Sequence, residues 1–260
     1  MDPILSAAAA PGRQFALFGA LHLTILFVTL ALPFALGRLT RREQRPRLAR
    51  GLALALAAIL LFDRVFALLW ANHIGRIAYW ANALPMHLCD WATFAVIIAL
   101  VGRRQLPYEL AYLWGLSGTF QAVLTPDTTE SPLNPLFISF FVGHCGIIIS
   151  VLFLTWGLGM RPKPGAVWRV WLCSQVYLLC AGLVNWIFRD HNPNFGYLAA
   201  KPPHGSLLDY FGPWPWYILT LEAMALVFYT IFYAPFWFAN RRASASGSVV
   251  GNWHAPPSQR

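Results

Sequence analysis

The sequence predicts an all-α, polytopic membrane protein with about seven transmembrane helices, and three observations support this fold class. Hydrophobic residues make up 58% of the 260-residue chain and charged residues only 11%, whereas soluble domains average about 25% charged residues. The apolar residues form long continuous runs, and about 20 of them suffice to cross ~30 Å of hydrocarbon as a helix. These runs do not alternate apolar and polar positions, as the strands of a membrane barrel would.

Seven apolar segments are long enough to be interpreted as membrane spans. The first is longer than the roughly 7–15-residue core of a signal peptide and shows no small-residue cleavage site before the arginines that follow it. The fourth is short and contains Gly115, Ser117 and Gly118, so we expect it to be tilted, broken or tightly packed. The expected spans are residues 14–36, 50–71, 79–101, 108–124, 135–158, 167–188 and 214–238.

Basic residues are concentrated on alternate connections between these spans. The positive-inside rule places such connections in the cytoplasm, so we expect an N-out, C-in orientation. The formal net charge of +9 then reflects orientation and some attraction to anionic lipid, and no nucleic-acid partner is expected. The residues concerned are Arg38, Arg41, Arg42, Arg45, Arg47 and Arg50, then Arg103 and Arg104, then Arg161, Lys163 and Arg169, and finally Arg241 and Arg242.

One membrane domain, residues 13–240, is expected between two disordered ends. Residues 1–12 are rich in Ala and Pro, and the cytoplasmic tail 241–260 contains Ser, Gly and Pro. No internal repeat is visible, so the repeat signature common in secondary transporters is missing. Residues 190–213 combine four prolines with several aromatic residues, which predicts an ordered cap over the outer helix ends.

With this orientation, polar residues from six spans fall in the outer half of the membrane, and the inner half is almost purely apolar. Ionisable groups at such depth are costly and usually face an interior cavity, so we expect a polar cavity that opens outward beneath the cap. Asp63 and Arg64 are adjacent and cannot both face one direction, so one of them should pair with another span. The expected substrate-binding residues are Asn185, Glu222, Tyr217, Gln121 and Arg64.

His144 and His87 are the candidate acid–base groups, because a neutral imidazole is the natural general base near pH 7. We expect His144 to act as the base and His87 as a second acid/base or oxyanion donor. Asp90 is three residues from His87 and shares its helix face, so it should orient His87 or pair with Arg64. Cys89 is a candidate nucleophile. Each of these residues also has a structural interpretation, as a polar contact between helices.

Other catalytic and metal-binding signatures are missing from the sequence. It contains no GxSxG elbow and no HExxH pair. His87, Cys89, Asp90 and His144 do not have a spacing diagnostic of metal ligands. We therefore expect no metal and no cofactor.

Three segments resemble a known family of bacterial integral membrane proteins, the YwaF-type family. They are LPMHLCD at residues 84–90, FFVGHCGII at residues 140–148 and KPPHGSLLDYFGPWPWYIL at residues 201–219. With the order of the spans, the resemblance covers about residues 14–240. It implies a multi-pass protein of the bacterial cytoplasmic membrane.

More distantly, the chain is similar to the transmembrane protein 164 family of animal acyltransferases that act on ether phospholipids. Beyond these it is similar to androgen-induced membrane hydrolases of fatty-acid esters. The resemblance implies that His144 corresponds to the core histidine and that Met86 stands where the acyltransferase has its nucleophilic cysteine. Methionine cannot be the nucleophile, so Cys89, or water on His87 or His144, would have to replace it.

The sequence leaves two leading functional hypotheses, with a structural or assembly role as a third. The first is a lipid-active acyltransferase or ester hydrolase with its cavity in the outer leaflet. The alternative is a non-enzymatic carrier or receptor for a lipid or small amphiphile, which would use the same cavity without chemistry. Membrane lipids are the expected partners under both hypotheses, and the oligomeric state is left open.

Overall fold

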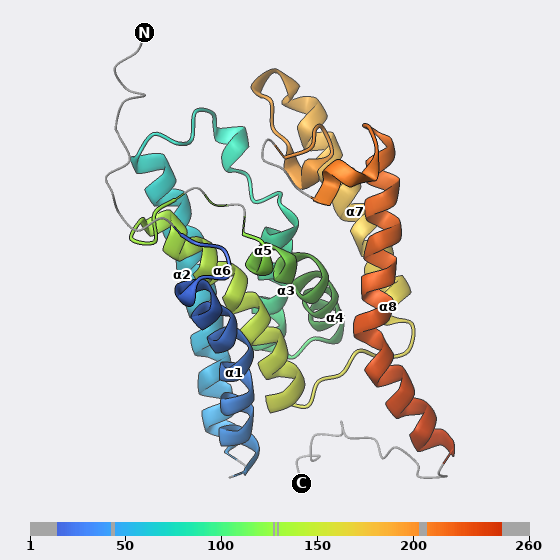
Figure 1. Ribbon diagram of the computed structural model, residues 1–260. Coiled ribbons are helices and arrows are strands. Elements are labelled where there is room, and N and C mark those ends of the chain that lie inside the picture. The colour runs from blue at the N-terminus through green and yellow to red at the C-terminus, as the bar shows by residue number, and fades with distance from the viewer. Residues whose placement is uncertain (1–14, 43–44, 127, 129, 203–206, 246–260) are drawn as a thin grey trace.

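The computed structural model describes residues 15–42, 45–126, 128, 130–202 and 207–245, and within these residues every regular element is helical. Residues 1–12 and 246–260 of the expected disordered ends lie outside the described residues. The last helix continues to Ala245, five residues into the segment that was expected to be a disordered tail. The helices run up and down between two ends of the molecule (Figure 1). We call these the cap end, where residues 190–202 and 207–213 lie, and the basic end, where α1 ends.

The element order follows the expected spans closely. Within the described part of the chain, five helices are long and apolar enough to cross a membrane: α1, α2, α6 with its extension η4, α7 and α8. The helix α3 is apolar but shorter, so seven crossings and the N-out orientation stay predictions. The bounds are α1 Ala20–Arg42, α2 Pro46–His73, α3 Leu88–Gly102, α4 Gln105–Trp114, η3 Gly115–Thr119, α5 Phe120–Leu124, α6 Pro135–Leu152, η4 Phe153–Gly157, α7 Ala166–Ile187 and α8 Trp216–Ala245, with short 3₁₀ turns η2 Trp80–Ala83, η5 Arg189–His191, η6 Phe195–Tyr197 and η7 Leu207–Phe211.

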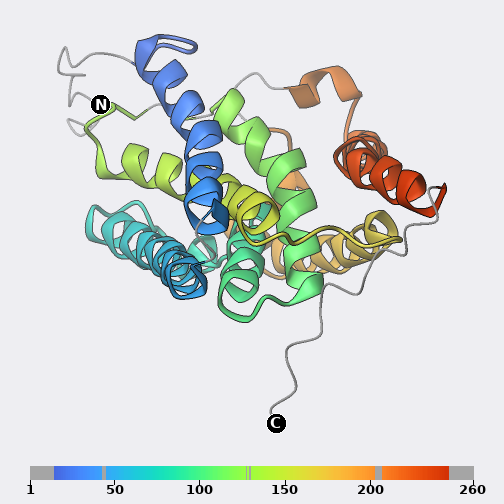
Figure 2. The same ribbon diagram turned by 90° about the horizontal axis from the view of Figure 1, so that it is seen from below.

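The lateral surface of the bundle is apolar. α1 and α2 lie on one flank and α8 on the other, with α3, α4 and α6 between them (Figures 1 and 2). Large side chains on the flanking helices face outward, and Phe27 of α1 and Phe62 of α2 are 71% and 70% exposed. Apolar surface of this extent marks contact with a membrane. The chain is therefore a multi-pass helical membrane protein.

The third expected span is wrong in its first part. Residues 79–87 form a 3₁₀ turn and extended chain, and the regular helix begins only at Leu88. Pro85 disfavours helical geometry in the residue before it. The backbone N–H of His87 donates to Oδ2 of Asp90 at 3.0 Å, which satisfies one donor at the start of the helix. The histidine thus lies on the chain that enters α3, not inside a regular helix.

Two π-helical turns interrupt the packed helices. The fourth expected span is one continuous helix from α4 through the π turn η3 into α5, and α6 ends in a second π turn, η4. In each turn a hydroxyl donates to the carbonyl four residues earlier, from Ser117 to Leu113 and from Thr155 to Val151. A Cβ on Gly115 would lie 3.1 Å from Cγ2 of Ile147. The small residues of this segment therefore allow the close packing that the sequence predicted.

A fully buried carboxylate at the basic end shows that the expectation of an almost purely apolar inner half is wrong. Glu109 of α4 is 0% exposed. Its oxygens accept bonds from the Gln105 amide at 2.7 Å, the Lys163 backbone N–H at 2.9 Å, and Nε and Nη2 of Arg169 at 2.9 Å each. The forked contact with the guanidinium is the strong form of this interaction. It fastens α4 to the start of α7 and to the connection before it.

Replacing Glu109 with alanine should lower the free energy of unfolding by about 1–3 kcal/mol, the cost of leaving buried donors unsatisfied. The effect stays in this range because the Arg169 side chain is 42% exposed and can turn to water. Thermal unfolding in a mild detergent measures the change. Arg161→Ala, at an exposed position of the same connection, is the control and should stay within about 0.5 kcal/mol of the wild type. Equal midpoints for the two variants would contradict the prediction.

Candidate functional site

A buried cluster of three charged side chains joins α2 to α3 in the interior of the bundle. Arg64 donates through Nη1 to Oδ1 of Asp90 at 3.1 Å and through Nη2 to Oδ2 of Asp63 at 3.2 Å. The side chains of Asp63 and Asp90 are only 5% and 10% exposed. The predicted pairing with another span is thus present. The expectation that Asp63 and Arg64 face apart is wrong, because the long arginine side chain folds back to its neighbour.

The cluster, which joins α2 to α3, also packs against the backbone of a third helix, α6, at Gly143. A Cβ at this position would lie 3.0 Å from Oδ2 of Asp63 and 3.1 Å from Nη2 of Arg64. Contacts this short force a neighbour to move, so glycine is what lets α6 approach the ion pair. The close approach also brings the next residue, His144, beside the cluster.

Replacing Gly143 with valine should therefore lower the free energy of unfolding by about 1–3 kcal/mol, the usual cost of overpacking. The measurement is the unfolding midpoint in detergent. Gly51→Val is the matched control, because nothing lies within 4 Å of a Cβ at Gly51. If Gly143→Val had the same unfolding midpoint as the control, the side chains of the cluster would be shown to move aside without loss of stability, and the prediction would be wrong.

His144 presents one free ring nitrogen next to the charged cluster. Its Nδ1 lies 2.7 Å from the carbonyl oxygen of Phe140, and its ring stacks on the Phe140 ring at 4.3 Å. A carbonyl can only accept, so Nδ1 carries the proton and Nε2 of the neutral ring carries the lone pair. His144 interacts electrostatically with Arg64, Asp90 and Asp63. The tautomer is the one that a general base acting through Nε2 requires.

His22 is a second histidine inside the bundle, and unlike His144 it has hydrogen bonds at both ring nitrogens. The backbone N–H of Phe18 donates to its Nδ1 at 3.0 Å, so Nε2 holds the proton and donates to the Val123 carbonyl at 2.8 Å. Both nitrogens are occupied, and the ring fixes α1 to the end of α5. His22 is a structural residue that sequence reasoning did not consider. Only the contacts distinguish it from His144.

His87 lies at the cap end and is an exposed residue. The ring packs edge-on against Phe195 at 5.1 Å. Asp90 binds the backbone N–H of His87, and no hydrogen bond joins the rings of His87 and His144. The two histidines are therefore near the same cluster without forming a direct relay.

Cys89 and Met86 flank His87 on the same stretch of chain. Cys89 is a free thiol in the first turn of α3 and interacts electrostatically with Arg64 and Asp90. Met86 packs against the small apolar cluster of Tyr177, Ala181 and Phe195 beneath the cap. The entry to α3 thus carries one thiol, at Cys89, and a thioether, at Met86, that cannot act as a nucleophile.

Asn185 and Tyr217, expected to bind substrate, hold the cap in place. The Asn185 amide accepts from the Phe195 backbone N–H at 2.9 Å and donates to the Phe195 carbonyl at 3.0 Å. The Tyr217 hydroxyl donates to the Tyr197 carbonyl, and Nζ of Lys201 lies 5.6 Å from the Tyr217 ring centre. These polar groups are engaged within the protein. The cap is consequently attached to α7 and α8.

Of the three remaining predicted substrate-binding residues, Glu222 and Gln121 do not join the cluster through any hydrogen bond or ion pair that the structure shows. Glu222 of α8 accepts from the Gln175 amide of α7, and Gln121 is half-buried in α5. Arg64 belongs to the cluster, and its Nε is buried without an acceptor. Among the described residues, no group of three or more His, Cys, Asp and Glu side chains is arranged to hold a metal ion.

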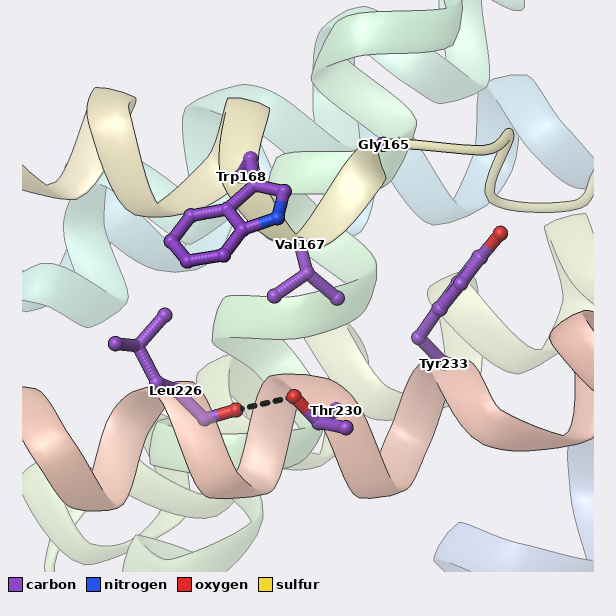
Figure 3. A pocket seen from close by; sticks show the side chains of 6 residues that line it. All are labelled: Gly165, Val167, Trp168, Leu226, Thr230 and Tyr233. Atoms are coloured by element: carbon purple, nitrogen blue, oxygen red, sulfur yellow. Dashed lines mark hydrogen bonds between the residues drawn. The ribbon is translucent and has the colours of Figure 1, made fainter.

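Two hollows in the surface lie away from the predicted site. One, of about 310 Å³, lies between α7 and α8, where Trp168 and Val167 face Leu226, Thr230 and Tyr233 (Figure 3). Its Thr230 hydroxyl is already bonded to the Leu226 carbonyl at 2.8 Å, so the wall offers little polar chemistry. The other, of about 830 Å³, lies between α1 and η4 at the basic end. Neither hollow is lined by a predicted site residue, so the polar cavity stays a prediction.

Comparison with known proteins identifies the family of the chain. No curated protein and no solved structure matches it. A family model, described as the TMEM164 family, matches residues 17–233. The matched region includes the charged cluster, both histidines beside it and the cap. The chain therefore belongs to the TMEM164 family.

Proposed function

We propose that this chain cleaves or transfers acyl esters of membrane lipids, with Nε2 of His144 as the general base. The observation that carries the proposal is the tautomer of His144, whose Nδ1 is held by the Phe140 carbonyl at 2.7 Å beside the buried Arg64–Asp90–Asp63 cluster. Ionisable groups inside an apolar bundle are expensive and mark functional sites. His22 differs from His144 in this respect, because both of its ring nitrogens are hydrogen-bonded within the protein and neither is left to act as a base.

The chemistry needs no nucleophile from the protein. A hydroxyl group gives its proton to Nε2 of His144 while its oxygen forms a bond to the ester carbonyl carbon. The carbonyl becomes an oxyanion, which the positive charge of Arg64 stabilises through the Nε–H that lacks an acceptor. The ester C–O bond then breaks, and the proton on Nε2 passes to the leaving alkoxide. Water as the attacking hydroxyl gives hydrolysis, and a lipid hydroxyl gives acyl transfer.

Two residues on the entry to α3 have secondary roles in this proposal. His87 is a second acid or base for the leaving group, since its ring is exposed at the cap end. Cys89 is the alternative nucleophile, which would form a thioester before the final acceptor attacks. Met86, at the position of the nucleophilic cysteine in the related acyltransferases, contributes only packing.

The membrane arrangement completes the proposal. Seven crossings with the N-terminus outside would place the cap end, and with it the acyl chemistry, in the outer leaflet of a bacterial cytoplasmic membrane. The alternate placement of basic residues supports this orientation.

The test is lipid turnover by the purified chain in nanodiscs of native lipid, followed by mass spectrometry in water labelled with heavy oxygen. Label in the released fatty acid indicates hydrolysis, and new acyl combinations without label indicate transfer. His144→Ala should abolish turnover, and His73→Ala, which changes an exposed histidine at the end of α2, should leave it unchanged. Loss in Cys89→Ala as well would assign the nucleophile to the thiol.

The carrier hypothesis makes the opposite prediction in the same experiment. If wild type and His144→Ala both leave every lipid unchanged while a lipid co-purifies with the wild type, the enzyme proposal is wrong. The cluster would then bind a ligand without chemistry.

A further inference from the structure

The larger hollow at the basic end has the size and composition of a ligand site. Its volume of about 830 Å³ lies within the roughly 300–1,000 Å³ of small-molecule sites. Phe34, Arg38 and Arg41 line it from α1, at spacings that put them on one helix face. Trp156 lines it from η4. Two guanidinium groups and two aromatic rings therefore share one concave surface.

Gly37, which lines this hollow, makes a close backbone contact with Gly157 of η4. A Cβ on Gly37 would lie 3.3 Å from both the Cα and the nitrogen of Gly157, so α1 and the π turn touch directly. The π turn carries Trp156 beside this contact, and its ring meets Phe34 edge-on at 5.9 Å and 89°. π turns are frequent at functional sites. The hollow is thus bounded by side chains that the contact between α1 and η4 holds in place.

Among the described residues, no carboxylate neutralises the positive charges in the hollow. The guanidinium carbon of Arg38 lies 4.0 Å from the centre of the Phe34 ring, and no carboxylate of the described residues pairs with Arg38 or Arg41. The one described carboxylate at this end, Glu109, is fully buried and engaged by Arg169. The ligand that complements this surface is an anion.

An apolar track leads away from the hollow along α1. Leu23, Phe27 and Leu30 are all exposed and precede Phe34 on the same helix face. The length of the track suits an acyl chain that runs into the hydrocarbon, while the arginines lie at the level of the headgroups. The anion is thus one that carries hydrocarbon chains.

We infer that the hollow formed by Phe34, Arg38, Arg41 and Trp156 binds the phosphate headgroup of an anionic glycerophospholipid. Arg38 and Arg41 contact the phosphate, and the rings of Phe34 and Trp156 contact the glycerol and the upper acyl carbons. The bound lipid lies against α1 at the end of the molecule opposite the proposed acyl chemistry. It is a resident lipid and not a substrate of that chemistry.

The test compares lipids retained by the full chain from nanodiscs of phosphatidylcholine and phosphatidylglycerol in equal amounts, counted by native mass spectrometry. The wild type should retain phosphatidylglycerol preferentially. The double variant Arg38→Gln/Arg41→Gln should lose on the order of tenfold in that preference. Ala35→Trp should lose it too, because Ala35 lines the hollow and the indole fills the space without changing charge. Added inorganic phosphate should not displace the lipid, since it has no acyl chains.

Arg103→Gln/Arg104→Gln is the matched control, because it removes the same charge from the same end at residues that do not line the hollow. It should retain the preference of the wild type. Equal losses in the two double variants would mean that only the general positive field attracts anionic lipid, and the proposal would be overturned. No loss in either Arg38→Gln/Arg41→Gln or Ala35→Trp would overturn it as well. Size-exclusion profiles of every variant establish that the proteins are folded.

Discussion

Replacing Arg64 with methionine should lower the free energy of unfolding by about 3–5 kcal/mol, the usual cost of removing one partner from a buried ion pair. The substitution leaves the carboxylates of Asp63 and Asp90, which are 5% and 10% exposed, without a counter-charge in an apolar bundle. Methionine keeps the length and apolar contacts of the arginine stem, so the loss reports charge and not volume. Unfolding in mild detergent measures the change.

A triple variant separates the charge imbalance from the packing of the cluster. Arg64→Met combined with Asp63→Asn and Asp90→Asn has no buried charge left, and such replacements are often neutral for stability. We expect the triple variant to recover most of the stability lost in the single variant. A triple variant less stable than Arg64→Met would contradict this account, because it would show that the three side chains stabilise the bundle through packing alone.

Replacing His144 with asparagine should reduce the proposed lipid turnover by about 10²–10⁴-fold, the usual contribution of a general base. The asparagine amide can still donate to the Phe140 carbonyl in place of Nδ1, but it has no basic nitrogen. Glutamine, whose amide reaches towards the Nε2 position, should be equally inactive. The measurement is the initial rate of product formation in nanodiscs, with the unfolding midpoint determined in parallel.

The buried His22 provides the control for this substitution. In His22→Asn the amide can still accept from Phe18 in place of Nδ1, but it cannot reach the Val123 carbonyl that Nε2 holds. This substitution should therefore lower the unfolding midpoint more than His144→Asn does, because His144→Asn loses no hydrogen bond within the protein. Turnover of His22→Asn below its unfolding temperature should stay near the wild-type rate. If His144→Asn kept wild-type turnover, Nε2 would not be the base.

The fold class could be predicted from the sequence because hydrocarbon imposes a simple rule of length and apolarity on helices. The clustering of Asp63, Arg64, Asp90 and His144 could also be predicted, since membrane depth places charged residues of different spans at one level. The depth of a residue in the membrane does not fix the direction of its side chain, however. The sequence therefore could not show that Arg64 reaches both carboxylates or that α6 contacts the cluster at Gly143.

Partners far apart in sequence are the part that could not be predicted. Glu109 and Arg169 lie 60 residues apart, and Glu109 stands in an apolar segment while Arg169 looks like one more orientation charge. His22 has no polar neighbour in the sequence, and its partners include Val123 from 101 residues away. The start of α3 could be predicted only in part. Pro85 indicates that the regular helix is interrupted near it, but the sequence does not show that the helix begins at Leu88.

The two π turns have a consequence for how sequences of this kind change in length. Each holds one residue more than an α-helix that turns through the same angle, so the sequence positions that share a helix face shift by one residue across it, while the helix itself keeps its direction. Deleting one residue from Gly115–Thr119 would return that turn to regular geometry without introducing a break. The same deletion inside α1 or α2 would rotate every later side chain off its face with nothing to absorb the change. The π turns are therefore the points in the bundle where single-residue insertions and deletions are most readily accommodated.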